Sequence, residues 1–230
     1  MPTPHLYLGN KAYSSWSLRP WLALKVSGIP FEETTMQMFT PETVAWLAAN
    51  SPNRKFPVLH HDDLVIAETI AIIEYIAELA PEAGLWPTDA KARAVARAVS
   101  AEMHAGFPDI RRYFSMHLRK RFPHYQPPEA AEAAVAVQVA RIEALWLDCR
   151  TRFGSGGPFL FGAFGAADCM FAPVVTRFVT YHVKLSTTSQ PYVDAVMAHP
   201  FMVEWIAAAQ TEGMEIASYE QLPDSVPFLS

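Results

Sequence analysis

Apolar residues follow two spacings in the first 80 residues of the chain. Short apolar runs bounded by glycine, proline or aspartate are typical of strands, and an apolar residue every three or four positions is typical of a helix with one buried face. These patterns predict, in order, a strand at His5–Leu8, a helix from the serines at 14–17 to Gly28, a strand at Phe31–Met38, a helix at Pro41–Ala49, strands at Val58–His61 and Leu64–Ala67, and a helix that begins at Glu68-Thr69. A strand–helix–strand crossover followed by a hairpin predicts a four-stranded mixed sheet.

The last helix of this region carries a candidate ligand site in its first turn. Ile70, Ile73 and Ile76 fall on one face, at the spacing of a buried stripe. Thr69 is a typical N-cap, and alone it indicates no more than a capped helix. A helix N-terminus also attracts a carboxylate, and Glu68 beside it would attract an ammonium group. Together the two residues predict the polar half of a site for an amino-acid-like ligand.

After a linker at residues 84–87, the residue pattern predicts helices for the remainder of the chain. The predicted helices are Asp89 to about Met116, bent or broken at Gly106-Phe107-Pro108; a long helix with the seam Val135, Val139, Ile142, Trp146 and Cys149; an apolar helix at Ala166–Thr180 whose first charged residue after the initial turn is Arg177; and two shorter helices around Val193 and at Phe201–Gln210. The helix at 166–180 is apolar on nearly every face, so we expect it to be buried. The sequence therefore predicts an α/β domain over residues 1–83 and an all-helical domain over residues 88–230.

Composition and charge narrow the class of protein. The 230 residues are 51% hydrophobic and 18% charged, with a net charge of −5 that gives no general attraction to nucleic acid or an anionic membrane. We expect the basic run at residues 111–121 to be a solvated helix end. The first ten residues lack a signal-peptide pattern, and no apolar run is long enough to span a bilayer. Two cysteines indicate no disulfide framework, so a cytoplasmic location is expected.

The histidines and acids of the chain do not predict a metal site. His60 and His61 are strand neighbours, so their side chains point to opposite faces of the sheet and make a poor metal pair. The remaining histidine, cysteine and acidic residues lack the spacing of a ligand set. We therefore expect no metal.

Two motifs resemble those of the cytosolic glutathione transferases, and the likeness extends over nearly the whole chain. KFPVL followed by the ET of AET is similar to the x-V-P-x-L and E-S pair of that family, and FLFGAFGAADCMFAP is similar to its F-L-x-G-x-x-x-[ST]-x-A-D-x-x-x-A-P signature. The resemblance implies a thioredoxin-like first domain with a cis peptide bond before Pro57. It also implies that Asp168 bonds back to the helix N-cap, where this chain has Gly165 in place of the usual serine or threonine.

The resemblance implies an activating hydroxyl near the first helix. YSSWSLRPWLAL is similar to the S-S-C-S-W-R-V-R-I-A-L stretch of the zeta class and the S-P-F-S-x-R-V of the tau class, and matching places the catalytic serine at Ser14, with Ser15 as the alternative. Tyr7 and Tyr13 are further hydroxyls. The zeta-class cysteine is replaced by Trp16, which argues against maleylacetoacetate-type isomerisation and against thiol exchange.

The resemblance also implies the remaining contacts and partners. The backbone of Phe56 before Pro57 would pair with the cysteinyl part of glutathione, Glu68 and Thr69 would hold its γ-glutamyl group, and Lys55 would approach its glycyl carboxylate. The acceptor pocket would be lined by Tyr113, Phe114 and His117. Glutathione is then the co-substrate, the acceptor is a small hydrophobic electrophile, and the protein is a homodimer.

Two alternative functions remain open from the sequence. The first is a zeta-like glutathione-dependent isomerase or dehalogenase. The second is a binding module with this fold and no turnover. A disulfide reductase is disfavoured because the first 148 residues contain no cysteine.

Overall fold

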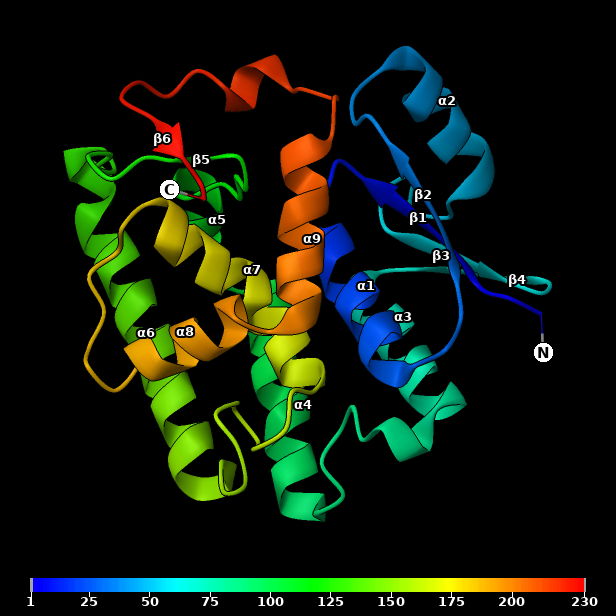
Figure 1. The fold of residues 1–230 in the computed structure, drawn as a ribbon, viewed down its shortest axis with the longest axis horizontal. Coiled ribbons are helices and arrows are strands. Elements are labelled where there is room, and N and C mark those ends of the chain that lie inside the picture. The colour runs from blue at the N-terminus through cyan, green and yellow to red at the C-terminus, as the bar shows by residue number, and fades with distance from the viewer. Residues whose placement is uncertain (1, 230) are drawn as a thin grey trace.

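A computed structural model describes residues 2–229 and shows a sheet domain beside a bundle of helices (Figure 1). The first part contains β1 (His5–Gly9), α1 (Ser15–Ser27), β2 (Glu32–Met36), α2 (Pro41–Asn50), β3 (Val58–His61), β4 (Leu64–Ala67), α3 (Thr69–Leu79) and the short η1 (Pro81–Ala83). The strand order is β2-β1-β3-β4, with β1 parallel to β2 and antiparallel to β3. The predicted four-stranded mixed sheet is confirmed.

The second part is built mainly from helices. Its elements are α4 (Ala90–Ala105), α5 (Pro108–Tyr113), β5 (Lys120–Arg121), α6 (Glu129–Phe153), α7 (Ala166–Thr180), α8 (Gln190–Met197), α9 (Pro200–Thr211), η2 (Ala217–Tyr219) and β6 (Val226–Pro227). The predicted break between α4 and α5 lies at Gly106 and Phe107. The expectation of helix alone is wrong in one detail, because β5 pairs with β6 in an antiparallel two-stranded sheet that holds the end of the chain beside the segment after α5.

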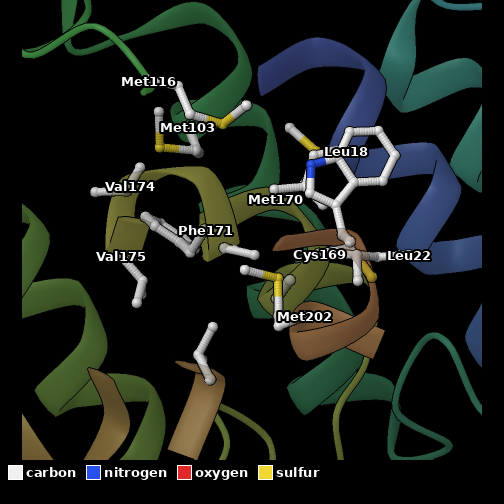
Figure 2. Packing of buried hydrophobic residues seen from close by; sticks show 14 of the residues in the cluster. Leu18, Leu22, Met103, Met116, Cys169, Met170, Phe171, Val174, Val175 and Met202 are labelled. Atoms are coloured by element: carbon white, nitrogen blue, oxygen red, sulfur yellow. The ribbon is translucent and has the colours of Figure 1, made fainter. Parts of the chain in front are cut away.

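The two parts share one hydrophobic core. Helix α1 packs on α3 in its own domain and on α7 and α9 in the other (Figure 1). Leu18 and Leu22 of α1 point toward Met170 of α7 and Met202 of α9 (Figure 2), and all four side chains are fully buried. Helix α7 is buried along nearly its whole length, as its apolar sequence predicts. Removing these apolar surfaces from water is the main force that fixes α1 against the helical domain.

The N-terminus of α7 is held by a buried carboxylate. One oxygen of Asp168 accepts the Gly165 N–H at 2.9 Å, and the other accepts the Leu160 N–H and the Tyr192 hydroxyl, each at 3.1 Å. Burial raises the pKa of Asp168 to about 6. The predicted bond from Asp168 to the N-cap amide is confirmed, and the carboxylate also fixes the loop before α7 and helix α8.

Replacing Asp168 with asparagine should destabilise the protein. The amide group keeps one acceptor oxygen and turns its NH2 toward a buried donor, so we expect the free energy of unfolding to fall by about 2–4 kcal/mol. Urea unfolding followed by circular dichroism measures this change. Asp148→Asn is the matched control, since Asp148 is exposed on α6; equal midpoints for the two variants would contradict the assignment.

Candidate functional site

Residues predicted to bind glutathione line one cavity of about 270 Å³. Its walls are Trp16, Asn53, Lys55, Phe56, Pro57, Glu68, Thr69, His104 and Ala105. The Phe56-Pro57 peptide bond is cis, as the resemblance implies. The loop before β3 and the first turn of α3 therefore face the end of α4 and the start of α1 across this cavity.

The first turn of α3 differs from the expected cap. Glu68, and not Thr69, occupies the N-cap position, with a positive φ of 72° and no hydrogen bond from its side chain to the helix. Its carboxylate accepts from Asn53 Nδ2 at 2.9 Å and lies 3.7 Å from His104 Nε2. Thr69 is the first helical residue, and its hydroxyl donates to the Trp16 carbonyl at 3.0 Å. The predicted threonine cap is therefore wrong, although both residues face the cavity.

The bond from Thr69 to Trp16 has a specific cause. In a regular helix the Trp16 carbonyl would accept from the amide four residues later, which is Pro20 and has no N–H. The threonine hydroxyl supplies the missing donor from outside the helix. It thereby couples the first turn of α1 to the first turn of α3.

The two serines lie in a second cavity of about 260 Å³ that shares Trp16 with the first. Ser14 is the N-cap of α1, and its Oγ accepts the Ser17 N–H at 3.3 Å and lies 2.7 Å from Ser17 Oγ. Ser17 Oγ already accepts the Gly9 N–H at 3.0 Å, so it can donate to Ser14 and leave the Ser14 proton free. Ser15 Oγ accepts from Arg177 Nη2 at 3.0 Å.

Neither tyrosine is placed as well as the serines to donate to a thiolate. The Tyr13 hydroxyl donates to Glu220 at 2.5 Å, and burial together with this bond raises its pKa to about 12. The Tyr7 ring stacks on His5, at 4.2 Å between centroids, and packs on Trp46 of α2. Tyr7 therefore lies on the face of the sheet that α2 covers.

The three residues predicted for the acceptor pocket do not line the serine cavity. His117 is fully buried with Nε2 3.0 Å from Glu220, Phe114 lines a different cavity of about 510 Å³, and Tyr113 is only partly buried. Helix α5 ends at Tyr113, and the chain then turns toward the interior. The side chains after Tyr113 therefore do not lie where a longer helix would place them. For the same reason the solvated helix end predicted for residues 111–121 is wrong, since residues 116–118 are buried.

The other walls of the serine cavity come from residues that were not predicted to belong to a site. They are Met38, Phe39, Arg111, Ser115, Met116, Arg177 and Tyr219. The one local signal among them was Arg177, a charge within an otherwise apolar helix. Tyr219 reaches the cavity from the C-terminal segment, a contact that no local pattern indicates.

The two cavities differ in charge: the serine cavity is lined by the cations Arg111 and Arg177, and the first cavity by one cation and one anion, Lys55 and Glu68. Burial lowers the pKa of His104, and the charges of Arg19 and Arg111 lower it further while Glu68 raises it. The lowered pKa favours the neutral form of the His104 ring. Across residues 2–229 no group of three or more His, Cys, Asp or Glu side chains is arranged to hold a metal ion. None of the helices in that range is long and apolar enough to cross a membrane.

The chain combines a mixed four-stranded sheet with a helical bundle. The cis-proline loop and Glu68 at the N-terminus of α3 face the first turn of α1. These features define the glutathione-transferase class of fold. Family descriptions for the glutathione S-transferase N-terminal and C-terminal domains match residues 13–79 and 129–208. The maleylacetoacetate isomerase of Rattus norvegicus is 30% identical over 190 residues, covering 80% of this chain and 82% of its own. The chain belongs to the glutathione S-transferase family.

Further relatives agree with this assignment. A probable maleylacetoacetate isomerase of Caenorhabditis elegans is 37% identical over 107 residues, or 46% of this chain, and the match spans about half, 49%, of that relative's length. The crystal structure of a glutathione transferase homolog from Burkholderia BGR1 with bound glutathione shares the fold, with a TM-score of 0.67 and 21% identity over 91% of this chain and 100% of that one.

The bond between Thr69 and Trp16 can be tested by substitution. Thr69→Val removes the hydroxyl at nearly constant volume and leaves the Trp16 carbonyl without a donor, so we expect unfolding to become easier by about 1–3 kcal/mol. Thr69→Ser keeps the donor and should retain most of the stability. Denaturant midpoints of the three proteins measure the effect, and a valine variant as stable as wild type would show that the bond contributes nothing.

Proposed function

We propose that this protein is a glutathione transferase in which a serine hydroxyl at the start of α1 activates the glutathione thiol. The observation that carries the proposal is the convergence of Phe56, Pro57, Glu68 and Thr69 on one cavity, directly beside the cavity that holds Ser14 and Ser15. Trp16 belongs to both, so a tripeptide bound in the first would bring its sulfur to the edge of the second.

The groups lining the first cavity match the parts of glutathione. The γ-glutamyl carboxylate would meet the N-terminus of α3 at Thr69, where free amide groups favour an anion. The ammonium group would meet the Glu68 carboxylate, and the glycyl carboxylate would approach Lys55. The Phe56 backbone would pair with the cysteinyl unit like an added strand.

The serines would supply the chemistry. A free thiol has a pKa of about 8.5, so at neutral pH most of it is protonated, whereas the thiolate is the nucleophile. A hydroxyl that donates to the sulfur, assisted by the N-terminus of α1, favours the thiolate. Ser14 is our first candidate because it caps α1 and because the Ser17 hydroxyl can donate to it, which would leave the Ser14 proton available, and Ser15 is the second.

The alternative is a zeta-like isomerase, which the names of two relatives favour. Trp16 occupies the position of the zeta-class cysteine and weighs against it. In either case the helical domain would supply the acceptor side, and the homodimer and the cytoplasmic location remain predictions. The intact set of cavity residues weighs against a binding module without turnover.

The thiol pKa of bound glutathione tests the mechanism. Thiolate absorbance against pH should give a depressed pKa in wild type, and Ser14→Ala should raise it by about 1–2 units, the equivalent of one hydrogen bond to a charged group. Ser15→Ala is measured beside it, and Ser27→Ala, at the other end of α1, is the control. An unshifted pKa in wild type would remove the proposed function, while a depressed pKa that only Ser15→Ala raises would move the role to Ser15.

A further inference from the structure

Three guanidinium groups cluster at or beside the serine cavity, and none of them forms an ion pair with a carboxylate of residues 2–229. Arg19 and Arg177 are buried, with 0% and 4% of their surface exposed, and Arg111 is partly buried. Arg111 and Arg177 line the cavity. Trp16 lies beside this cluster, with the Arg19 and Arg111 guanidinium carbons 4.6 and 4.5 Å from its ring centroid.

Every partner that holds these groups in the described chain is neutral. Arg19 donates to the carbonyls of Met170 and Ser15 at 2.9 and 3.0 Å. Arg111 donates to the carbonyls of Met103, His104 and Gly106, at the C-terminal end of α4, where a cation is favourable. Arg177 donates from Nη2 to Ser15 Oγ. Within residues 2–229, Arg177 Nε, Arg177 Nη1 and Arg19 Nη2 are buried without a partner.

This arrangement is costly in the free protein. Burial, and then the repulsion from Arg111, lowers the pKa of both Arg19 and Arg177, that of Arg177 to about 9, so Arg177 still carries its charge at neutral pH. A buried charge without a counter-charge is strongly destabilising. Two acids of the C-terminal segment have other partners, since Glu220 binds Lys120 at 2.5 Å and Glu212 accepts the Lys11 and Ala12 amides. A ligand that carries an anion would supply the missing counter-charge.

We propose that the serine cavity is an anion-binding site, and that the preferred acceptors are small electrophiles that carry a carboxylate, bound by Arg177 with the support of Arg111. The inference rests on the proposed function and replaces the purely hydrophobic acceptor expected from the sequence. One glutathione thiolate supplies a single negative charge against three guanidinium groups, which leaves room for a second anion. The unpartnered Nε and Nη1 of Arg177 lie on either side of Nη2 in the planar guanidinium, and each can donate a charge-assisted hydrogen bond to a carboxylate oxygen.

The matched acceptors 4-(bromomethyl)benzoate and 4-(bromomethyl)benzamide differ in this one charge. In both, the glutathione sulfur attacks the benzylic carbon, a C–S bond forms, and the C–Br bond breaks with its electron pair leaving on bromide; the thiol proton goes to solvent. We compare kcat/KM for each acceptor with its uncatalysed rate. Wild type should favour the benzoate by about tenfold or more, the effect of one hydrogen-bonded charge pair.

Substitution of Arg177 decides whether the cavity causes the preference. Arg177→Met should abolish it, and Arg177→Lys, which keeps the charge but not the planar guanidinium, should retain part of it. Arg112→Gln removes an exposed arginine one residue from Arg111 and should leave both rates unchanged. Equal acceleration of both acceptors in wild type, or a preference that survives in Arg177→Met, would overturn the inference while the transferase function stands.

A binding measurement separates the inference from turnover. Calorimetry with the unreactive 4-methylbenzoate and 4-methylbenzamide should show benzoate binding about tenfold tighter or more in wild type and in Arg112→Gln, and no such difference in Arg177→Met. If neither bromide is accelerated but this difference is present, the proposed function fails and the anion site stands. Its absence would overturn the anion site whatever the rates.

Stability without ligand gives a further expected outcome. Because Arg177 is buried without a counter-charge, Arg177→Met should unfold at a higher temperature than wild type when no ligand is present. Added 4-methylbenzoate should raise the midpoint of wild type and not that of the variant. A methionine variant that melts lower than wild type would show that the charge is already compensated within the protein.

Discussion

Three hydrogen bonds hold the first turn of α1, and the arrangement of both cavities depends on this turn. Thr69 of the sheet domain donates to the Trp16 carbonyl, Arg19 from the same helix donates to the Ser15 carbonyl, and Arg177 of the helical domain donates to the Ser15 hydroxyl. Pro20 makes the first of these bonds necessary by removing the donor that a regular helix would supply. The serines are thus positioned by both domains, and small movements between the domains are opposed at the site where sulfur and acceptor would meet.

The apolar core stabilises the fold, whereas the buried arginine at the serine cavity destabilises it. Around Leu18 and Met170 the interface between the domains is apolar and buried, which stabilises the fold (Figure 2). A short distance along α7, Arg177 places an unbalanced charge in the same interface. Proteins retain such destabilising groups where function uses them. The packing of α1 and α7 offsets the cost and allows the charge to remain in a defined position.

The strands, most of the helices and the wall of the first cavity formed by the loop before β3 and the start of α3 were predictable because their signals are local. The cis-proline loop and the start of α3 lie within 15 residues of one another, from Lys55 to Thr69, and fold into one wall. The other walls of the serine cavity were not predictable in the same way. They come from the loop after β2, from α5 and the turn beyond it, from α7 and from the C-terminal segment. A continuous helix predicted through residues 111–121 placed Phe114 and His117 at this cavity, which they do not line. The role of Thr69 depends on Pro20, which has no N–H to donate to the Trp16 carbonyl. The sequence shows the proline, but it does not show that Thr69 lies close enough to replace the donor.

The pairing of β5 with β6 makes the serine cavity depend on a segment that is distant in the sequence. Tyr219 belongs to a stretch that is anchored beyond it, where Phe228 is buried and its amide donates to the Arg119 carbonyl at 3.0 Å. A protease cut between α9 and β6 would therefore release one wall of the serine cavity. The walls of the first cavity include no residue of this segment and would stay in place.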